Sequence, residues 1–167
     1  MYHVGDRVIY TAHGVCDVTG VEDRVEDGKQ VSFLVLEPVG QSGSRYLLPT
    51  QNPVAMSKVH KVLTVEELEQ LFQSPEVQGV FWIREENLRK QSYREVIVSG
   101  DRKRILAMVN SLYHHKRDQA MAGRKVHLCD ENFLRDAEKL LVSEISVVMN
   151  LEPVAAKQYI RKKLNCE

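Results

Sequence analysis

The stretch Val62-Leu63-Thr64-Val65-Glu66-Glu67 separates two kinds of hydrophobic pattern in this chain of 167 residues. Its last four residues form a capping box, in which Thr64 is the N-cap of a helix and Glu67 is the third helical residue. Before this stretch apolar residues alternate as they do in strands, and after it they recur every 3.6 residues as in helices. We therefore expect an α+β protein with a boundary between residues 62 and 63.

The segment before the boundary is a series of short strands separated by turns. Residues 4–10 and 15–21 alternate between apolar and polar side chains, and residues 32–36 are a short apolar run. Arg45-Tyr46-Leu47-Leu48 ends at Pro49, which cannot donate to a sheet ladder and suits a strand end. Five short strands at this spacing predict a small closed or half-open β-barrel of SH3 or Tudor type over residues 1–62.

The segment from residue 63 to residue 167 is expected to be an all-helical domain of about five helices. A helix should start near Phe81 or Trp82, after the interruption at Gly79. Ser99-Gly100-Asp101 predicts a corner between two helices, with Gly100 as the left-handed C-cap and Asp101 as the next N-cap. We expect Asp130 to cap a later helix in the same way.

Composition and cysteine spacing argue against several classes of protein. A content of 43% hydrophobic and 28% charged residues is that of a soluble globular protein. No apolar run approaches the roughly 20 residues that span a membrane, and the first residues lack the features of a signal peptide. Cys16, Cys129 and Cys166 have no close partner at metal spacing. We expect a cytoplasmic protein with reduced thiols and without a metal or a cofactor.

Charge is balanced over the chain but unevenly distributed. Residues 84–127 contain eleven Lys and Arg against five Asp and Glu, an excess of six positive charges. Residues 128–152 contain two against six, an excess of four negative charges. One face of the helical domain could therefore meet phosphates although the net charge is zero. No catalytic constellation or Gly-rich phosphate loop is found, so an enzyme is not expected.

Several motifs resemble one family in the right order along the chain. Val4-Gly5-Asp6-Arg7-Val8-Ile9-Tyr10, His13-Gly14-Val15 and Leu48-Pro49-Thr50-Gln51-Asn52 resemble the CarD/CdnL transcription regulators of bacteria. They also resemble the polymerase-interacting domain of the transcription-repair coupling factor. Trp82 and residues 137–144 resemble the helical domain of CarD. The resemblance covers nearly the whole chain.

The resemblance implies a monomeric, non-enzymatic regulator that binds the β subunit of RNA polymerase and promoter DNA. The Tudor-like domain (1–62) would dock on the polymerase by strand addition. The helical DNA-binding domain (63–167) would lie at the upstream edge of the transcription bubble and stabilise the open complex. Such a protein would be cytoplasmic and associated with the nucleoid through RNA polymerase.

For the polymerase contact, the resemblance points to Arg24 on a hairpin. Where the family has a second basic residue this chain has Leu47, and Arg45 lies on the same side of that strand because strand side chains alternate. Without the resemblance, Arg24 would be no more than a charge at a hairpin tip.

For the DNA contact, the resemblance points to Trp82 as a wedge in the minor groove, with Arg84, Arg89 and Lys90 on phosphates. Taken alone, Trp82 fits a core anchor as well, and the cations fit a solvated helix face. Two other functions stay open: a protein-binding adaptor without DNA contact, and an RNA-binding module.

Overall fold

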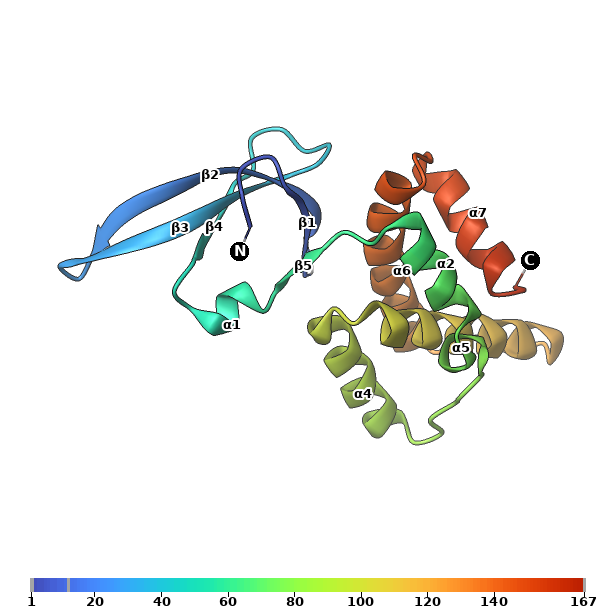
Figure 1. Ribbon diagram of the computed structural model, residues 1–167. Coiled ribbons are helices and arrows are strands. Elements are labelled where there is room, and N and C mark those ends of the chain that lie inside the picture. The colour runs from blue at the N-terminus through green and yellow to red at the C-terminus, as the bar shows by residue number, and fades with distance from the viewer. Residues whose placement is uncertain (1, 12, 167) are drawn as a thin grey trace. The chain divides into compact units, whose positions relative to one another are not determined.

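The computed structural model describes residues 2–11 and 13–166 and divides the chain into two compact units, Met1–Val62 and Leu63–Glu167 (Figure 1). Within the described residues, the first unit contains five strands and one short helix, and the second contains six helices. Each unit has a hydrophobic core of its own. The expected α+β class is confirmed.

The first unit is built on one antiparallel sheet. Its elements are, in order, β1 (Arg7–Tyr10), β2 (Gly14–Glu26), β3 (Lys29–Pro38), β4 (Tyr46–Pro49), α1 (Pro53–Met56) and β5 (Val59–Lys61). Across the sheet the strand order is β4-β3-β2-β1-β5. β2 and β3 form a long hairpin that continues as a ribbon beyond the other strands (Figure 1).

The sheet is open, so of the expected closed or half-open barrel the closed form is not found. β4 and β5 are the two end strands, and the pairings of the described residues do not join them. A barrel closes only when its first and last strands share hydrogen bonds. Short alternating strands occur in open and closed sheets alike, so the local pattern could not distinguish the two.

One face of the sheet carries the core of the first unit. Its buried members are Val8, Cys16, Val18, Leu34, Leu36, Leu48 and Val59. Leu34 and Leu36 are two residues apart on β3 and therefore point to the same side. The intervening Phe33 and Val35 point to the opposite face, where their row continues onto β2 and β4.

The second unit begins with the capping box that the sequence predicts. Its helices are α2 (Val65–Gln73), α3 (Pro75–Gln78), α4 (Glu86–Ser99), α5 (Arg102–Met121), α6 (Leu128–Val148) and α7 (Pro153–Lys163). The Thr64 side chain accepts the N–H of Glu67, and the Glu67 side chain accepts the N–H of Thr64. Gly100 ends α4 in the left-handed conformation, with φ of 65°, and Asp101 caps α5. Both corner predictions are confirmed.

Two predicted helix starts are wrong. The helix expected to start near Phe81 or Trp82 starts at Glu86, and Glu85 caps it. α6 starts at Leu128, so Asp130 lies inside its first turn and is not its cap. The apolar run around Trp82 suited a helix and an extended segment equally, and in the structure it is extended.

The core of the second unit lies among the helices, and α5 contributes more buried residues to it than any other helix. Ile105, Leu106, Val109 and Leu112 of α5 are each at most 3% exposed. Phe72 of α2, Ile145 of α6 and Ile160 of α7 complete the same cluster. In the part of the chain that the structure describes, no helix is both long and apolar enough to cross a membrane.

Candidate functional site

Trp82 lies in the extended segment between α3 and α4 and is half-buried. Its ring stacks on the imidazole of His115, with ring centroids 3.5 Å apart and 9° between the planes. The guanidinium carbon of Arg89 lies 4.6 Å from the centre of the Trp82 ring. Burial is the main cause that lowers the pKa of His115, so a neutral imidazole is expected at pH 7. Only part of the Trp82 ring is thus free for a partner.

Arg89, which the resemblance assigns to a phosphate, is buried and already paired in this structure. Its side chain is 3% exposed and donates to both carboxylate oxygens of Asp130, at 2.8 and 2.9 Å. It also donates to the carbonyl of Ile83 at 3.0 Å, which fixes the segment that carries Trp82. The hydrogen bonds to Asp130 are the first cause that raises the pKa of Arg89. The physical reason is the later start of α4, which turns Arg89 toward α6.

Arg84 and Lys90 remain at the surface. Arg84 is exposed, whereas the Lys90 ammonium pairs with Glu86 one turn earlier, at 2.5 Å. This pair lowers the pKa of Glu86 and raises that of Lys90. The structure therefore leaves Arg84 available to an anion and places Lys90 in competition between Glu86 and any phosphate.

Phe81 is the exposed aromatic residue that the sequence did not single out. It is 76% exposed although it stands next to half-buried Trp82. Neighbouring side chains in an extended segment point to opposite sides, so packing of Trp82 leaves Phe81 in solvent. The Ser111 hydroxyl oxygen accepts the N–H of Phe81 at 3.1 Å and fixes its backbone. An extended assignment of this segment would have predicted one exposed and one packed ring.

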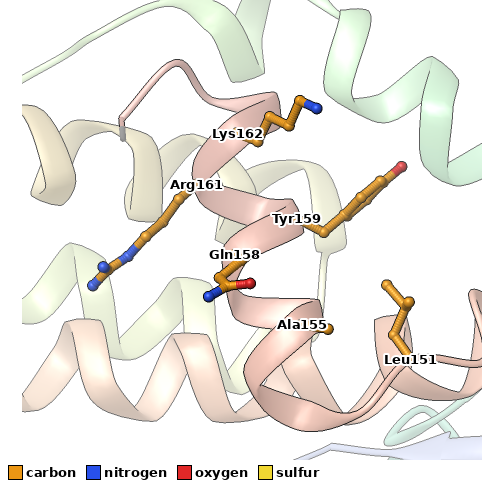
Figure 2. A pocket seen from close by; sticks show the side chains of 6 residues that line it. All are labelled: Leu151, Ala155, Gln158, Tyr159, Arg161 and Lys162. Atoms are coloured by element: carbon orange, nitrogen blue, oxygen red, sulfur yellow. The ribbon is translucent and has the colours of Figure 1, made fainter.

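A hollow on α7 is less suited to a ligand. Its volume is about 540 Å³, and Leu151, Ala155, Gln158, Tyr159, Arg161 and Lys162 line it. Figure 2 shows that Arg161 and Tyr159 leave the helix in opposite directions. The Tyr159 hydroxyl donates to Glu69, and the guanidinium of Arg161 lies over the Tyr113 ring. Tyr159 and Arg161 thus already have partners, and the two side chains do not converge.

The titratable groups of the described residues form no metal centre. No group of three or more His, Cys, Asp or Glu side chains among them is placed to hold a metal ion. The thiol of Cys16 is buried, and burial is the main cause that raises its pKa to about 11. Cys16 is thus a protonated core residue at neutral pH.

Arg24 and Arg45 converge on a single carboxylate in the first unit. The Glu22 carboxylate accepts from Arg24 at 2.9 Å and also from Arg45. These two hydrogen bonds lower the pKa of Glu22, and the one from Arg24 has the larger effect. The Arg24 guanidinium also lies 5.9 Å from the centre of the Phe33 ring. We call these four residues, Glu22, Arg24, Phe33 and Arg45, the Arg24 cluster.

The register explains why the Arg24 cluster forms on the sheet face opposite the core. Glu22 of β2 is opposite Phe33 of β3, which is opposite Pro49 of β4. Leu47 is opposite Val35 on the same face and is half-buried. The structure therefore brings together the three residues expected to contact the polymerase, Arg24, Arg45 and Leu47. Glu22, which joins two of them, was not predicted.

Residues 2–60 match the family of the CarD-like/TRCF RID domain. The first unit is therefore similar to the CarD-like/TRCF RID domain. The resemblance to CarD/CdnL regulators is thereby confirmed for this part of the chain. RID stands for RNA polymerase-interacting domain, and the match supports a polymerase-binding, transcription-associated protein.

The RID domain presents a free strand edge beside the Arg24 cluster. β1 pairs with β2 only from Gly14 to Asp17, whereas β3 pairs with β2 as far as Glu26. Residues 19–26 thus have a paired strand on one side only, as far as the described residues show. Such an edge can accept the backbone of a further strand.

Three aromatic rings gather elsewhere in the RID domain. Tyr10, His13 and Tyr46 have ring centroids between 4.3 and 5.3 Å apart. An aromatic cage for a methylated amine needs space between its rings for the cation. These rings fill the space with one another, so they do not form such a cage.

Proposed function

We propose that this protein is a non-enzymatic transcription regulator that binds the β subunit of RNA polymerase and promoter DNA at the upstream edge of the transcription bubble. At this position it stabilises the open complex. The protein acts in the cytoplasm. The observation that carries the proposal is the RID domain of residues 2–60, with the Arg24 cluster beside a free strand edge. The β subunit, the DNA and the open complex are parts of the proposal.

The polymerase contact combines backbone pairing with charge. A partner strand along residues 19–26 gains hydrogen bonds from the β2 backbone, which give affinity with little dependence on sequence. Arg24 and Arg45 then offer guanidinium donors that can bind a partner's carboxylate in two-pronged geometry. Glu22 holds both guanidinium groups in place before the partner arrives.

The DNA contact rests on the exposed cations of the helical domain. Between residues 84 and 127, the exposed ones for which no ion pair is found in the described residues are Arg84, Arg94, Arg104, Lys116, Arg124 and Lys125. These side chains can bind phosphates, which carry most of the sequence-independent affinity for DNA. In this proposal the free part of the Trp82 ring enters the minor groove.

Open-complex stabilisation follows from differential binding. A protein shifts the melting equilibrium only by the difference between its affinities for melted and closed promoters. A difference of about 1.4 kcal/mol changes the ratio of open to closed complexes tenfold. Contacts of Trp82 with the junction exist only after melting, so they supply this difference.

A second candidate is an adaptor that binds the polymerase without touching DNA. Burial of Arg89 and pairing of Lys90 with Glu86 favour it, because they reduce the positive charge near Trp82. The two candidates differ in the dependence of DNA affinity on salt.

We expect the full chain to bind fork-junction DNA with a log–log salt slope of roughly −2 to −3, as for about three phosphate contacts. Arg84→Ala should flatten the slope by about one unit, whereas Lys90→Ala should change it less. The measurement is a fluorescence anisotropy titration between low and moderate salt. A slope near zero would leave only the adaptor.

A further inference from the structure

A groove opens on the helical domain between α4 and α5, next to Phe81. Its volume is about 210 Å³, which is below the roughly 300–1,000 Å³ of pockets for drug-sized ligands. Tyr93 and Val96 line it from α4, Arg104, Met108 and Ser111 line it from α5, and Phe81 stands at its rim. A groove of this size suits one flat ring system rather than a helix of a partner protein. We call it the α4–α5 groove.

The lining of the α4–α5 groove includes a buried hydroxyl without a partner. Tyr93 is 5% exposed, and its hydroxyl makes no hydrogen bond within the described residues. Burial is the main cause that raises its pKa to about 12, so the hydroxyl stays protonated and can donate. The hydroxyl oxygen itself is not solvent-accessible, so a ligand gains this hydrogen bond only when side chains around Tyr93 move aside.

The rim of the α4–α5 groove combines an exposed ring with a cation. Phe81 is 76% exposed, and its backbone is fixed by Ser111. Arg104 is exposed, and its guanidinium has no ion pair within the part of the chain that is described. Its neighbour Lys103 instead pairs with Glu76 at 3.5 Å and does not line the groove.

We propose that the α4–α5 groove binds one unstacked base of the single-stranded DNA that appears when the promoter melts. The inference rests on the proposed function. A nucleotide has flat apolar faces, a polar edge and a phosphate. The face stacks on Phe81, the edge enters the groove and the phosphate meets Arg104. The match of these three features with the groove favours a nucleotide over a peptide side chain.

The test is a double-mutant cycle that combines Phe81→Ala with the removal of single bases from fork-junction DNA. Binding of the full chain is measured at low salt. Each unpaired base near the junction is replaced in turn by an abasic site, which keeps the phosphate. At one position the abasic site should weaken binding about fivefold to a hundredfold, the range for loss of one base–aromatic stack. Phe81→Ala should cause a similar loss on intact DNA and abolish the effect of the abasic site.

Arg104→Ala should weaken binding to every fork-junction DNA, the abasic ones included. Val80→Ala and Lys103→Ala are matched controls, because both residues are neighbours that do not line the groove, and they should leave the abasic effect intact. Phe81 is mostly exposed, so the variant should melt at the temperature of the native chain.

Two outcomes would overturn the groove and are separable from failure of the proposed function. If the native chain binds fork DNA but no abasic site weakens this binding, the groove takes no base. The same conclusion follows if the losses of affinity from Phe81→Ala and from the abasic site are additive. If Phe81→Ala instead weakens binding to polymerase without DNA, the groove takes a protein side chain. A native chain that binds no DNA would overturn the DNA part of the proposed function as well.

Discussion

Arg24 and Arg89 have the same side chain in opposite surroundings. Arg24 is exposed, and its bond to Glu22 competes with water, so the pair adds little stability. Arg89 is 3% exposed and bonded to Asp130, which is fully buried. A buried charge that loses its partner costs far more than a surface charge. Arg24 can therefore serve a partner, whereas Arg89 serves the fold.

Arg24→Glu should weaken binding to the polymerase β subunit by about tenfold or more without unfolding the protein. The change sets two carboxylates beside each other and reverses the charge that the partner meets, and like charges at an interface are strongly unfavourable. The measurement is affinity by titration, with circular dichroism to check the fold. Lys29→Glu at the hairpin end makes the same charge change outside the Arg24 cluster and should have a smaller effect. Equal losses in both variants would contradict a specific role for Arg24.

Asp130→Asn should lower the free energy of unfolding by about 3–5 kcal/mol, because it leaves the buried Arg89 charge without its counterion. Urea unfolding measures this loss. Glu131→Gln removes an exposed carboxylate from the same helix turn and should cost less than about 0.5 kcal/mol. A small loss for Asp130→Asn would mean that water reaches Arg89.

Elements governed by local chemistry could be predicted from the sequence. The Thr64 capping box and the corner at Gly100 each depend on residues within one turn, and both occur as expected. The start of α4 could not be predicted, because it depends on contacts between distant residues. Arg89 and Asp130 are 41 residues apart, and the Trp82 ring stacks on His115 of α5. Only the packed fold shows which of Phe81 and Trp82 is exposed.

The contact between α2 and α7 should depend on pH. The Lys163 ammonium and the Tyr159 hydroxyl both donate to Glu69, and Lys163 is the first cause that lowers the pKa of Glu69. A carboxyl whose pKa is lower in the folded state stabilises the fold above its unfolded pKa and loses this effect as pH falls through the folded one. The contribution should be present at pH 6, begin to fall near the ordinary value of 4.5 and vanish below the folded pKa.

Glu69→Gln tests this dependence. Because the Glu69 side chain is 31% exposed, the variant should be less stable by less than about 1 kcal/mol at pH 6, and this difference should shrink as pH falls below 4.5. Urea unfolding across this range gives the difference. Glu66→Gln, in the exposed first turn of α2, serves as the control. A difference between Glu69→Gln and the native chain that persists unchanged at pH 3 would contradict the ion pair as its cause.

At the scale of the whole molecule, the sequence indicated the α+β class and the polymerase-interacting domain. The period of apolar residues and the turn residues indicate the strands and helices, and the ordered motifs in residues 2–60 indicate the similarity of the first unit to the RID family. Closure of the sheet, the burial of Arg89 and the α4–α5 groove depend on how elements pack, which periodicity does not contain. Site residues transferred by resemblance therefore required the structure to separate surface from interior.

The most direct test of the account is the lifetime of open promoter complexes of bacterial RNA polymerase with and without the full chain. Heparin challenge prevents rebinding, so the decay measures the stability of complexes already open. The native chain should lengthen the lifetime, by about tenfold for a difference of 1.4 kcal/mol between open and closed states. Arg24→Glu should lengthen it far less at the same concentration. An unchanged lifetime with saturating native protein would contradict the stabilisation of the open complex.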